Sequence, residues 1–452
     1  MMAVQEAARV LDAEWRGKDA FFTWVSTDSR TVKRGDLFIA LRGDKFDGHK
    51  FVAVAKEKGA VAAMVCQGLE IGNQESGIPL ILVKDTRLGL GRLAAYWRGR
   101  FTIPLVAVTG SNGKTTVKEM IASILRQREG GADSVLATAG NLNNDVGVPQ
   151  TLLRLREQHA YAVIEMGMNH AGEISYLTRL AQPSVALITN AGAAHVEGLG
   201  SVEAVARAKG EVFEGLDQTG VAVINADDPY APLWRELAGS RRVIDFGLGG
   251  SAMVSACYQA NLFGSKMTLT LPDGVEEVTL QVPGEHSVRN ALAAAAVTTA
   301  MGIGKKFIAL GLSGFSGVKG RMQKKCGLHD SMLIDDSYNA NPESVRAALA
   351  VLAAVPGKKI LVLGDMGELG GSAVVFHECI GEDACRAGID RLFAMGELSA
   401  YAVAKFGAGA RHFERIEELL AEVRNQLAAD VTVLVKGSRF MQMERVVKGI
   451  EL

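Results

Sequence analysis

The sequence predicts an α/β protein of three domains, built mainly on parallel β-sheets. Three observations support this fold class. A chain of 452 residues is too long for one ordinary core. Its apolar fraction of 48% is sufficient to fill several cores. Over most of the chain, short apolar runs alternate with amphipathic stretches, which is typical of parallel sheets covered by helices on both faces.

Two sets of apolar runs are the predicted strands. The first set is Leu105–Val108, Ala162–Ile164, Val185–Ile188 and Val221–Ile224. The second set is Met332–Ile334, Ile360–Leu363, Leu392–Ala394 and Val431–Val435. Amphipathic runs such as Ser344–Ala354 lie between them and are expected to be helices. Each set therefore predicts one parallel sheet.

Two segments interrupt the alternation and indicate where the domains divide. Residues 265–283 predict a β-hairpin with Asp273 and Gly274 at its turn. Residues 311–320 are rich in glycine and follow a predicted helix, so we expect a joint there. The predicted domains are residues 1–84, a small α/β module; residues 85–313, the central domain; and residues 314–452, a Rossmann-like α/β domain.

Composition argues against several classes of protein. Lys and Arg number 49 against 50 Asp and Glu, so there is no basic excess of the kind that nucleic-acid-binding chains carry. The longest apolar run, 291–301, is too short to cross a bilayer, and the first residues lack the apolar core of a signal peptide. The five cysteines have no metal-binding spacing. We therefore expect a cytoplasmic protein without a membrane span or a nucleic-acid partner.

The strongest motif is a glycine-rich turn between a predicted strand and the predicted helix Val117–Leu125. Its glycines allow backbone N–H groups to face phosphate oxygens beside the positive end of the helix dipole. Lys114 is expected to contact the β- and γ-phosphates, and the Thr115 hydroxyl to reach Mg²⁺. The motif predicts ATP binding in a central P-loop, ATPase-like domain. Its predicted ligands are Gly110, Ser111, Asn112, Gly113, Lys114, Thr115 and Thr116.

Further polar residues follow the next predicted strands, where the active site of an open parallel sheet lies. Glu165 ends one strand and is a candidate Mg²⁺ ligand, although it could also cap a structural feature. His195 follows another strand, but most lone histidines are neither ligands nor bases. The loop 141–149 is rich in amides and suits a polar ligand or a capped turn. Lys209 lies in a helical run, and the residues alone do not distinguish it from a solvated helix lysine.

Taken together and in order, these motifs resemble the Mur ligase family. The resemblance is carried by the TGSNGKTT loop, the EMG strand end, the NAGAAH loop, the AKGE lysine and the run GEHSVRNALAA at 284–294. Other elements resemble the MurF branch of that family: Asp28–Arg30, Asp47–His49, Asn141–Pro149, Asp335–Pro342, Gly364–Gly370 and Lys436–Arg439. No D-N-P-R motif of the diaminopimelate- or lysine-adding branch is present.

The resemblance implies a role for each matching residue. Lys114 would hold phosphates, Thr115 and Glu165 a first Mg²⁺, and His195 a second. Lys209 would be carbamylated by CO₂ and so become an anion that reaches metal. The catalytic set is thus Lys114, Glu165, His195 and Lys209. Asn290 would lie near the adenine, and Arg321 and Asp336 would close over phosphate and ribose. The implied substrate-binding residues are Ser29, Arg30, Asp47, His49, Asn143, Asn144, Asn339, Lys436 and Arg439.

The resemblance also implies the reaction and its partners. It predicts an ATP- and Mg²⁺-dependent ligase that adds D-alanyl-D-alanine to UDP-N-acetylmuramoyl-tripeptide through an acyl phosphate, and we expect a monomer. Three alternatives remain: a sister ligase that uses a single amino acid or a folate-type acceptor, a nucleotide-binding switch without catalysis, and a nucleic-acid-dependent ATPase. The first would be active with a single amino acid, and the second would not turn over ATP with both co-substrates.

Overall fold

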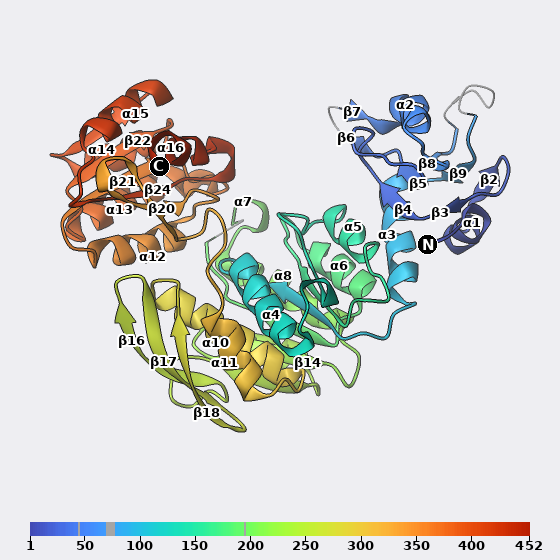
Figure 1. Ribbon diagram of the computed structural model, residues 1–452, viewed down its shortest axis with the longest axis horizontal. Helices are drawn as coiled ribbons and strands as arrows, with labels where there is room; N and C mark the ends of the chain where they lie inside the picture. The colour runs from blue at the N-terminus through green and yellow to red at the C-terminus, as the bar shows by residue number, and fades with distance from the viewer. Residues whose placement is uncertain (44–45, 69–76, 194–195) are drawn as a thin grey trace.

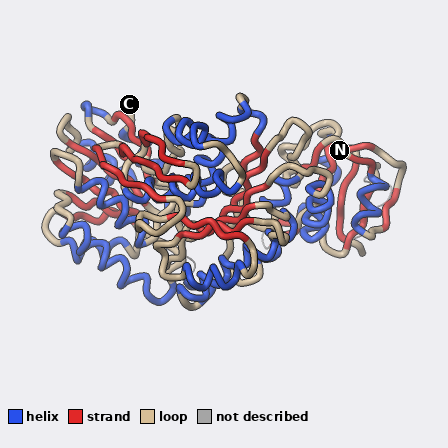
Figure 2. The backbone as a smooth tube through the Cα atoms, turned by 90° about the horizontal axis from the view of Figure 1, so that it is seen from below, coloured by secondary structure: helices blue, strands red, loops and turns tan. Residues whose placement is uncertain are grey.

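The computed structural model describes residues 1–43, 46–68, 77–193 and 196–452. The described residues form three large sheets with helices packed on them, and these are the cores of an N-terminal, a central and a C-terminal domain. Figure 1 shows the central domain between the other two, and Figure 2 shows the strands as layers between helices. Among the described residues, no helix is long and apolar enough to cross a membrane.

The N-terminal domain is built on a sheet in the order β2-β9-β8-β5-β4. These strands are β2 (Glu14–Arg16), β9 (Leu80–Val83), β8 (Ala62–Cys66), β5 (Asp36–Ile39) and β4 (Trp24–Ser26). All pairs are parallel except that of β2 with β9. One face packs on α1 (Val4–Leu11) and α3 (Thr86–Arg98), and the other on α2 (Val52–Glu57). Short strands β1 (Met2–Ala3) and β3 (Phe21–Phe22) pair at its margin, as do β6 (Arg42–Gly43) and β7 (Phe46–Asp47).

The central sheet has the order β11-β12-β10-β13-β14-β15 and is parallel throughout. Its strands are β11 (Val135–Ala137), β12 (Tyr161–Glu165), β10 (Leu105–Thr109), β13 (Val185–Ile188), β14 (Val221–Asn225) and β15 (Arg242–Phe246). Its helices are α4 (Lys114–Glu129), α5 (Gly147–Leu152), α6 (Glu173–Ala181), α7 (Val196–Leu199), α8 (Val202–Gly210), α9 (Ala231–Ala238), α10 (Glu285–Ala300) and α11 (Lys305–Ser313).

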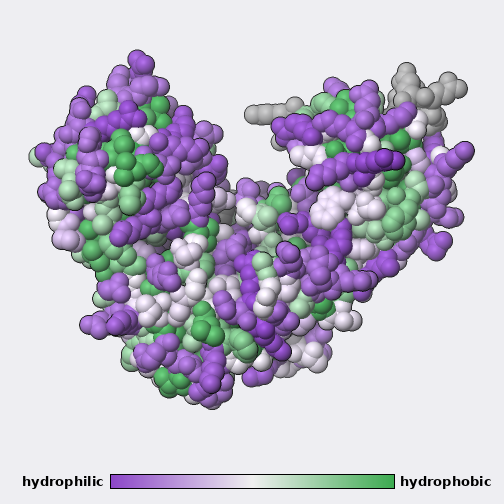
Figure 3. All heavy atoms as spheres, in the orientation of Figure 1, coloured by the Kyte–Doolittle hydropathy of each residue, from purple (hydrophilic) through white to green (hydrophobic). Residues whose placement is uncertain are grey.

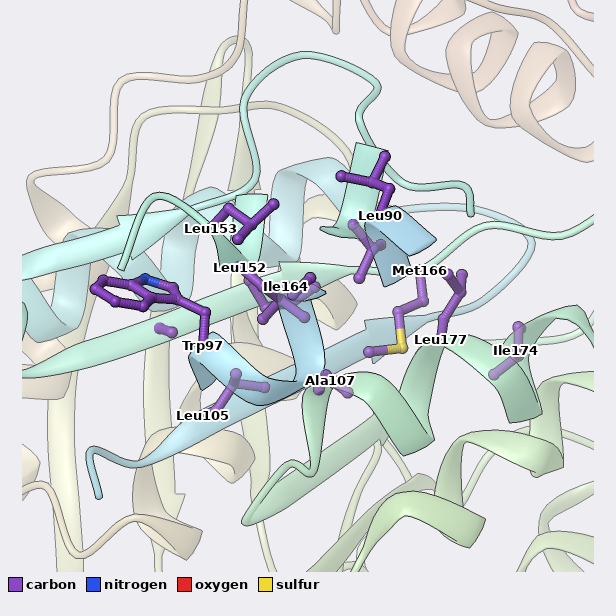
Figure 4. Packing of buried hydrophobic residues seen from close by; sticks show 14 of the residues in the cluster. Leu90, Trp97, Leu105, Ala107, Leu152, Leu153, Ile164, Met166, Ile174 and Leu177 are labelled. Carbon is purple, nitrogen blue, oxygen red and sulfur yellow. The ribbon is translucent and has the colours of Figure 1, made fainter. Parts of the chain in front are cut away.

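Alternation along the strands divides the central core into two layers. Val106 and Val108 of β10 face a cluster that contains α4, α10 and α11. Leu105 and Ala107 face the opposite cluster, which contains α3, α5 and α6 (Figure 4). Both sets of side chains are buried because a parallel sheet between two helix layers has no solvent face. The second cluster is continuous with the N-terminal core, so α3 joins the two domains through one apolar interior.

The predicted hairpin is part of a three-stranded antiparallel sheet. Its strands are β16 (Ser255–Asn261), β17 (Gly264–Leu271) and β18 (Gly274–Leu280). Leu271 pairs with Gly274, so the turn residues are Pro272 and Asp273, and Gly274 already belongs to β18. The predicted turn was therefore one residue too late. Proline favours the first turn position because its ring fixes φ.

The C-terminal sheet has the order β19-β20-β24-β21-β22-β23, and only β19 is antiparallel. Its strands are β19 (Gln323–Cys326), β20 (Met332–Asp336), β24 (Val431–Lys436), β21 (Lys358–Gly364), β22 (Arg391–Met395) and β23 (Ala410–Phe413). One face packs on α12 (Pro342–Ala353), α13 (Ala373–Arg386) and α14 (Ser399–Phe406). The other packs on α15 (Ile416–Asn425) and α16 (Glu444–Ile450).

The fold class predicted from sequence is confirmed, and each predicted strand lies within an observed one. The alternation was a sufficient signal because buried parallel strands are short apolar runs. The predicted joint at 311–320 begins inside the last turn of α11, after which the chain leads to β19. The domain limits at residues 84 and 313 stay predictions. Figure 3 shows a hollow between the N-terminal and C-terminal domains, bordered largely by hydrophilic residues.

Candidate functional site

The glycine-rich turn connects β10 to α4 at the carboxyl edge of the central sheet. Gly110 has φ 147° and Gly113 has φ 82°, in the region that favours glycine. A Cβ at Gly110 would collide with the Thr189 hydroxyl, and a Cβ at Gly113 would collide with the Asn290 side-chain oxygen. The backbone of the turn is thus packed directly against its neighbours. Gly113 is also the N-cap of α4, so the helix N-terminus opens at this loop.

The turn is held by hydrogen bonds to the end of β13. Ser111 N donates to Asn190 O at 3.0 Å, and Asn112 N donates to Asn190 Oδ1 at 2.9 Å. The Thr189 hydroxyl donates to Asn112 O at 2.7 Å. These bonds fix the loop on a neighbouring strand, so its conformation does not depend on a ligand.

The Lys114 ammonium folds back over the turn. Its Nζ donates to Gly110 O at 2.6 Å and lies 3.4 Å from Ser111 O. Removal from water lowers the pKa of Lys114, while the nearby Glu165 carboxylate opposes this shift. A cation in this place suits phosphate oxygens arriving at the helix N-terminus.

Thr115 and Glu165 face each other across the carboxyl edge of the sheet. The Thr115 hydroxyl donates to Glu165 Oε2 at 2.8 Å, and Asn143 Nδ2 donates to Glu165 Oε1 at 2.9 Å. Glu165 is only 2% exposed, and Asn143 therefore orients a buried carboxylate. A hydroxyl and a carboxylate are hard oxygen donors of the kind that Mg²⁺ prefers with phosphates and water. These residues fit a magnesium ion.

Lys209 lies on α8 and is 1% exposed, so it is not a solvated helix lysine. No hydrogen bond or ion pair connects its side chain to any residue that the structure describes. Burial lowers the pKa of Lys209 well below the usual value, and the charge of nearby Lys114 lowers it further. Both effects favour the neutral, nucleophilic form of its amine. Only the family resemblance singled out Lys209 in the sequence; the residue pattern by itself did not predict its burial, because burial of α8 is a tertiary property.

A cavity of about 1100 Å³ opens between the central and C-terminal domains. It brings together most of the predicted site residues from both domains. Those that line it are Ser111, Asn112, Gly113, Lys114, Thr115, Thr116, Asn143, Asn144, Glu165, Asn290, Arg321, Asp336, Asn339, Lys436 and Arg439. Gly110 and Lys209 lie outside its lining. His195 lies outside the described residues.

The C-terminal domain contributes a charged cluster to the cavity. Arg321 Nη2 donates to the Thr115 hydroxyl at 3.0 Å, and its guanidinium carbon lies 4.4 Å from the centre of the Tyr338 ring. Lys436 Nζ donates to Asp336 Oδ2 at 2.5 Å and to Asn339 O at 3.0 Å. A cation from the second domain thus already reaches the residue that follows Lys114 in the P-loop.

The predicted substrate residues of the N-terminal domain lie away from this cavity. The Asp28 carboxylate pairs with Arg30 at 2.7 Å, and this bond lowers the pKa of Asp28. His49 is buried; its Nδ1 lies 2.6 Å from Asp47 Oδ1, and its Nε2 accepts from Cys66 N at 3.0 Å. Both ring nitrogens are therefore used within the domain. His49 fixes a loop, while Arg30 is exposed to solvent.

Two other predicted substrate residues have local structural partners. Asn144 Oδ1 accepts from Val146 N and Gly147 N, and so caps the start of α5. Arg439 Nη1 donates to Glu444 Oε1 at 2.9 Å. Both still line the cavity.

Many residues that line the cavity were not predicted from the sequence to have a role in the site, and three of them are Glu343, Phe440 and His286. Glu343 and Phe440 directly follow motifs that had been recognised, and His286 lies inside one. Phe440 is 64% exposed despite its size. Burial lowers the pKa of His286, while Asp336 from the C-terminal domain opposes the shift. The only signal for these three residues in the sequence was that each lies in or next to a recognised motif. Their contacts depend on how the central and C-terminal domains meet.

Family comparisons cover most of the chain. Residues 22–98 match the Mur ligase family catalytic domain, residues 108–298 match the Mur ligase middle domain, and residues 320–439 match the Mur ligase glutamate ligase domain. A protein of Escherichia coli (strain K12) named UDP-N-acetylmuramoyl-tripeptide–D-alanyl-D-alanine ligase is 42% identical over 100% of this chain and 98% of its own length. A Bacillus subtilis protein of the same name is 36% identical over 94% and 92%.

Solved structures give the same relationship. The crystal structure of MurF from Acinetobacter baumannii has a TM-score of 0.90 and 36% identity, and covers 98% of this chain and 97% of that one. MurF ligase from Thermotoga maritima in complex with ADP has a TM-score of 0.82 and 26% identity, with 94% and 96% coverage. With a relative of 42% identity along its full length and three matching domains in order, this chain belongs to the Mur ligase family.

Proposed function

We propose that this protein joins D-alanyl-D-alanine to UDP-N-acetylmuramoyl-tripeptide, with ATP converted to ADP and phosphate. The observation that carries the proposal is one cavity in which a phosphate loop, a hydroxyl–carboxylate pair and cations of a second domain converge. Full-length likeness to ligases of that name supports the choice of substrates. The Mur ligase relatives and the ADP-bound neighbour support the use of ATP.

ATP binding is assigned to the turn 110–116 and to the facing residues of both domains. Backbone N–H groups of the turn and the Lys114 ammonium would bind phosphate oxygens. Arg321 already lies against Thr115 and would neutralise charge from the opposite side. Asn290 and Asp336 line the same cavity and would contact the nucleoside.

Magnesium binding is assigned to Thr115 and Glu165. Their donor atoms lie within hydrogen-bond distance, and Asn143 holds the carboxylate in place. When bound, the ion would supply Lewis-acid stabilisation of the phosphates. His195 stays the candidate ligand of a second ion.

Lys209 is assigned as a carbamylated lysine. Its neutral amine would attack CO₂, form an N–C bond and release one proton, which leaves an anionic carbamate. Burial disfavours an ammonium group at this position, and the positive charge of neighbouring Lys114 favours an anion there.

The reaction is divided into two steps because a carboxylate is a poor electrophile. The terminal carboxylate of the tripeptide attacks the γ-phosphorus of ATP, which forms an acyl phosphate and releases ADP. The amine of D-alanyl-D-alanine, after loss of a proton, attacks the acyl carbon and expels phosphate. Lys114 and Arg321 offset the negative charge that the two anions bring together. Closure of the domains orders the reactants and excludes water.

The UDP-sugar is assigned to the N-terminal domain near Ser29 and Arg30, beside the Asp47–His49 loop. Asn144 lines the cavity that contains the P-loop residues, and Asn339, Lys436 and Arg439 would place the dipeptide. We further propose a monomer in the cytoplasm. Light scattering during gel filtration should give about the chain mass of 48.0 kDa.

The test is phosphate release from ATP with UDP-N-acetylmuramoyl-tripeptide, with and without D-alanyl-D-alanine. We expect release only when both substrates are present, together with a product heavier by the dipeptide residue mass. Release with a single amino acid and none with the dipeptide would assign the protein to a sister ligase. Release without the tripeptide would contradict the acyl-phosphate route.

A further inference from the structure

The first turn of α12 binds the segment that follows β13. Glu343 Oε1 accepts a hydrogen bond from Ala193 N at 2.8 Å, which links the C-terminal and central domains. The other oxygen, Oε2, is buried and has no hydrogen-bond partner among the described residues. A carboxylate so placed acts mainly through the one bond that it makes to Ala193.

Three successive amides of this segment have three different acceptors. Ala191 N donates to Asp228 Oδ2 at 3.0 Å, and Gly192 N donates to the Ser111 hydroxyl at 2.9 Å. Both acceptors belong to the central domain. Ala193 N has its acceptor in the C-terminal domain, at Glu343. The segment is therefore fully held only when α12 is docked on the central domain.

The docking surface is shaped for this carboxylate. A Cβ at Gly192 would lie 2.9 Å from Glu343 Oε2, closer than real Cβ atoms approach, and 3.0 Å from its Cδ, which is tighter than most real contacts. The N-cap of α12, Asn341, donates its Nδ2 to Asn112 Oδ1 at 2.8 Å. One helix turn thus contacts both the 190–193 segment and the P-loop. The two contacts would form and break together.

We propose that Glu343 is a positioning residue for the ligation step. By accepting the Ala193 amide it orders residues 190–193 against the P-loop when the C-terminal domain closes. The effect on ligation rests on the proposed function, whereas the ordering does not. The bond to the Ala193 amide needs only an acceptor oxygen, so a glutamine at position 343 preserves it. If Glu343 instead bound a cationic group of a substrate, its negative charge would be needed and glutamine would not replace it.

The test combines hydrogen exchange with steady-state kinetics on the full chain. Without substrates, Glu343→Ala should increase exchange of the Ala193 amide about tenfold, which corresponds to loss of one hydrogen bond. It should also lower kcat about tenfold with little change in KM for ATP, because the P-loop keeps its bonds to Asn190. Glu343→Gln should restore most of the exchange protection of the Ala193 amide and most of kcat. The control is Arg346→Ala on the same helix, which breaks an ion pair with Asp383 that lies inside the C-terminal domain.

Unchanged exchange in Glu343→Ala would overturn the proposal. So would a glutamine variant as impaired as the alanine variant, since the charge and not the hydrogen bond would then matter. Exchange is read without substrates, so its outcome is independent of the ligase assignment. Absence of ligase activity in the unmodified protein would refute the proposed function and leave the exchange result interpretable.

Discussion

At the scale of single residues, surroundings decide the chemistry more than residue type does. Glu165 is held by Thr115 and Asn143, and it stays a defined acceptor at 2% exposure. Lys209 has no such partner in the described part of the chain, and burial lowers its pKa. The surroundings thus make Glu165 a candidate metal ligand and Lys209 a candidate nucleophilic amine.

Replacement of Lys209 should nearly abolish turnover. We expect Lys209→Ala to lower kcat by about a hundredfold or more, in the range seen when a preorganised charge is removed. Added bicarbonate should not restore activity, because alanine has no amine to carbamylate. Phosphate release is the measurement, and a variant with the wild-type rate would exclude the assigned role.

The burial of Lys209 should also cost stability. Because its pKa is lowered in the folded state, the unfolded chain binds the extra proton below pH about 10.4. Unfolding free energy therefore falls as pH drops below that value, by about 1.4 kcal/mol for each unit of pKa shift. Lys209→Met should unfold at a higher temperature than the wild type at pH 7. The difference between the two unfolding temperatures should become smaller toward pH 10. Calorimetry in CO₂-free buffer measures this, and a less stable variant would contradict it.

At the scale of elements, the junction of β10 and α4 makes a phosphate site from backbone alone. The end of β13 supports the turn, and the helix opens at Gly113. Since a Cβ at Gly113 would meet Asn290, the loop and α10 are fitted to each other without space for a side chain. The site therefore depends on one strand–turn–helix unit and two of its neighbours.

Gly113→Ala should weaken ATP binding. The positive φ and the collision with Asn290 both displace the turn, and strain of this kind costs about 1–3 kcal/mol. We expect KM for ATP to rise about tenfold. Gly130→Ala is the matched control, because Gly130 ends the same helix at φ 71° with no atom near a Cβ. Equal effects of the two substitutions on KM would show that the collision is unimportant.

At the scale of the whole molecule, aromatic and cationic contacts fix the N-terminal domain on the central one. The Arg156 guanidinium carbon lies 4.5 Å from the Trp24 ring centre and 5.7 Å from that of Trp97. Its Nη2 also donates to Thr23 O at 3.2 Å. One side chain thus joins β4, α3 and the segment after α5, and it helps to set how far the proposed UDP-sugar site lies from the P-loop.

Loss of this contact should affect the tripeptide substrate more than ATP. Arg156→Ala removes the stacking and the interdomain hydrogen bond, together about 1–2 kcal/mol. We expect KM for UDP-N-acetylmuramoyl-tripeptide to rise about tenfold while KM for ATP changes less than about twofold. Arg100→Ala is a suitable control, since the Arg100 guanidinium carbon lies 5.2 Å from the Trp97 ring centre while its ion pair is with Glu6 of the N-terminal domain. An equal change in both KM values would argue for general destabilisation.

The sequence by itself determined the fold class, the eight central and C-terminal strands that were predicted, and the phosphate loop. These depend on local patterns: apolar runs of strand length, and glycines where a turn meets a helix. Only the tertiary structure decided that Lys209 is buried, that His49 is internally bonded, and that Glu343 meets Ala193. Burial and contacts between residues 150 positions apart depend on how helices and domains pack, and such packing is not encoded in any short stretch of sequence.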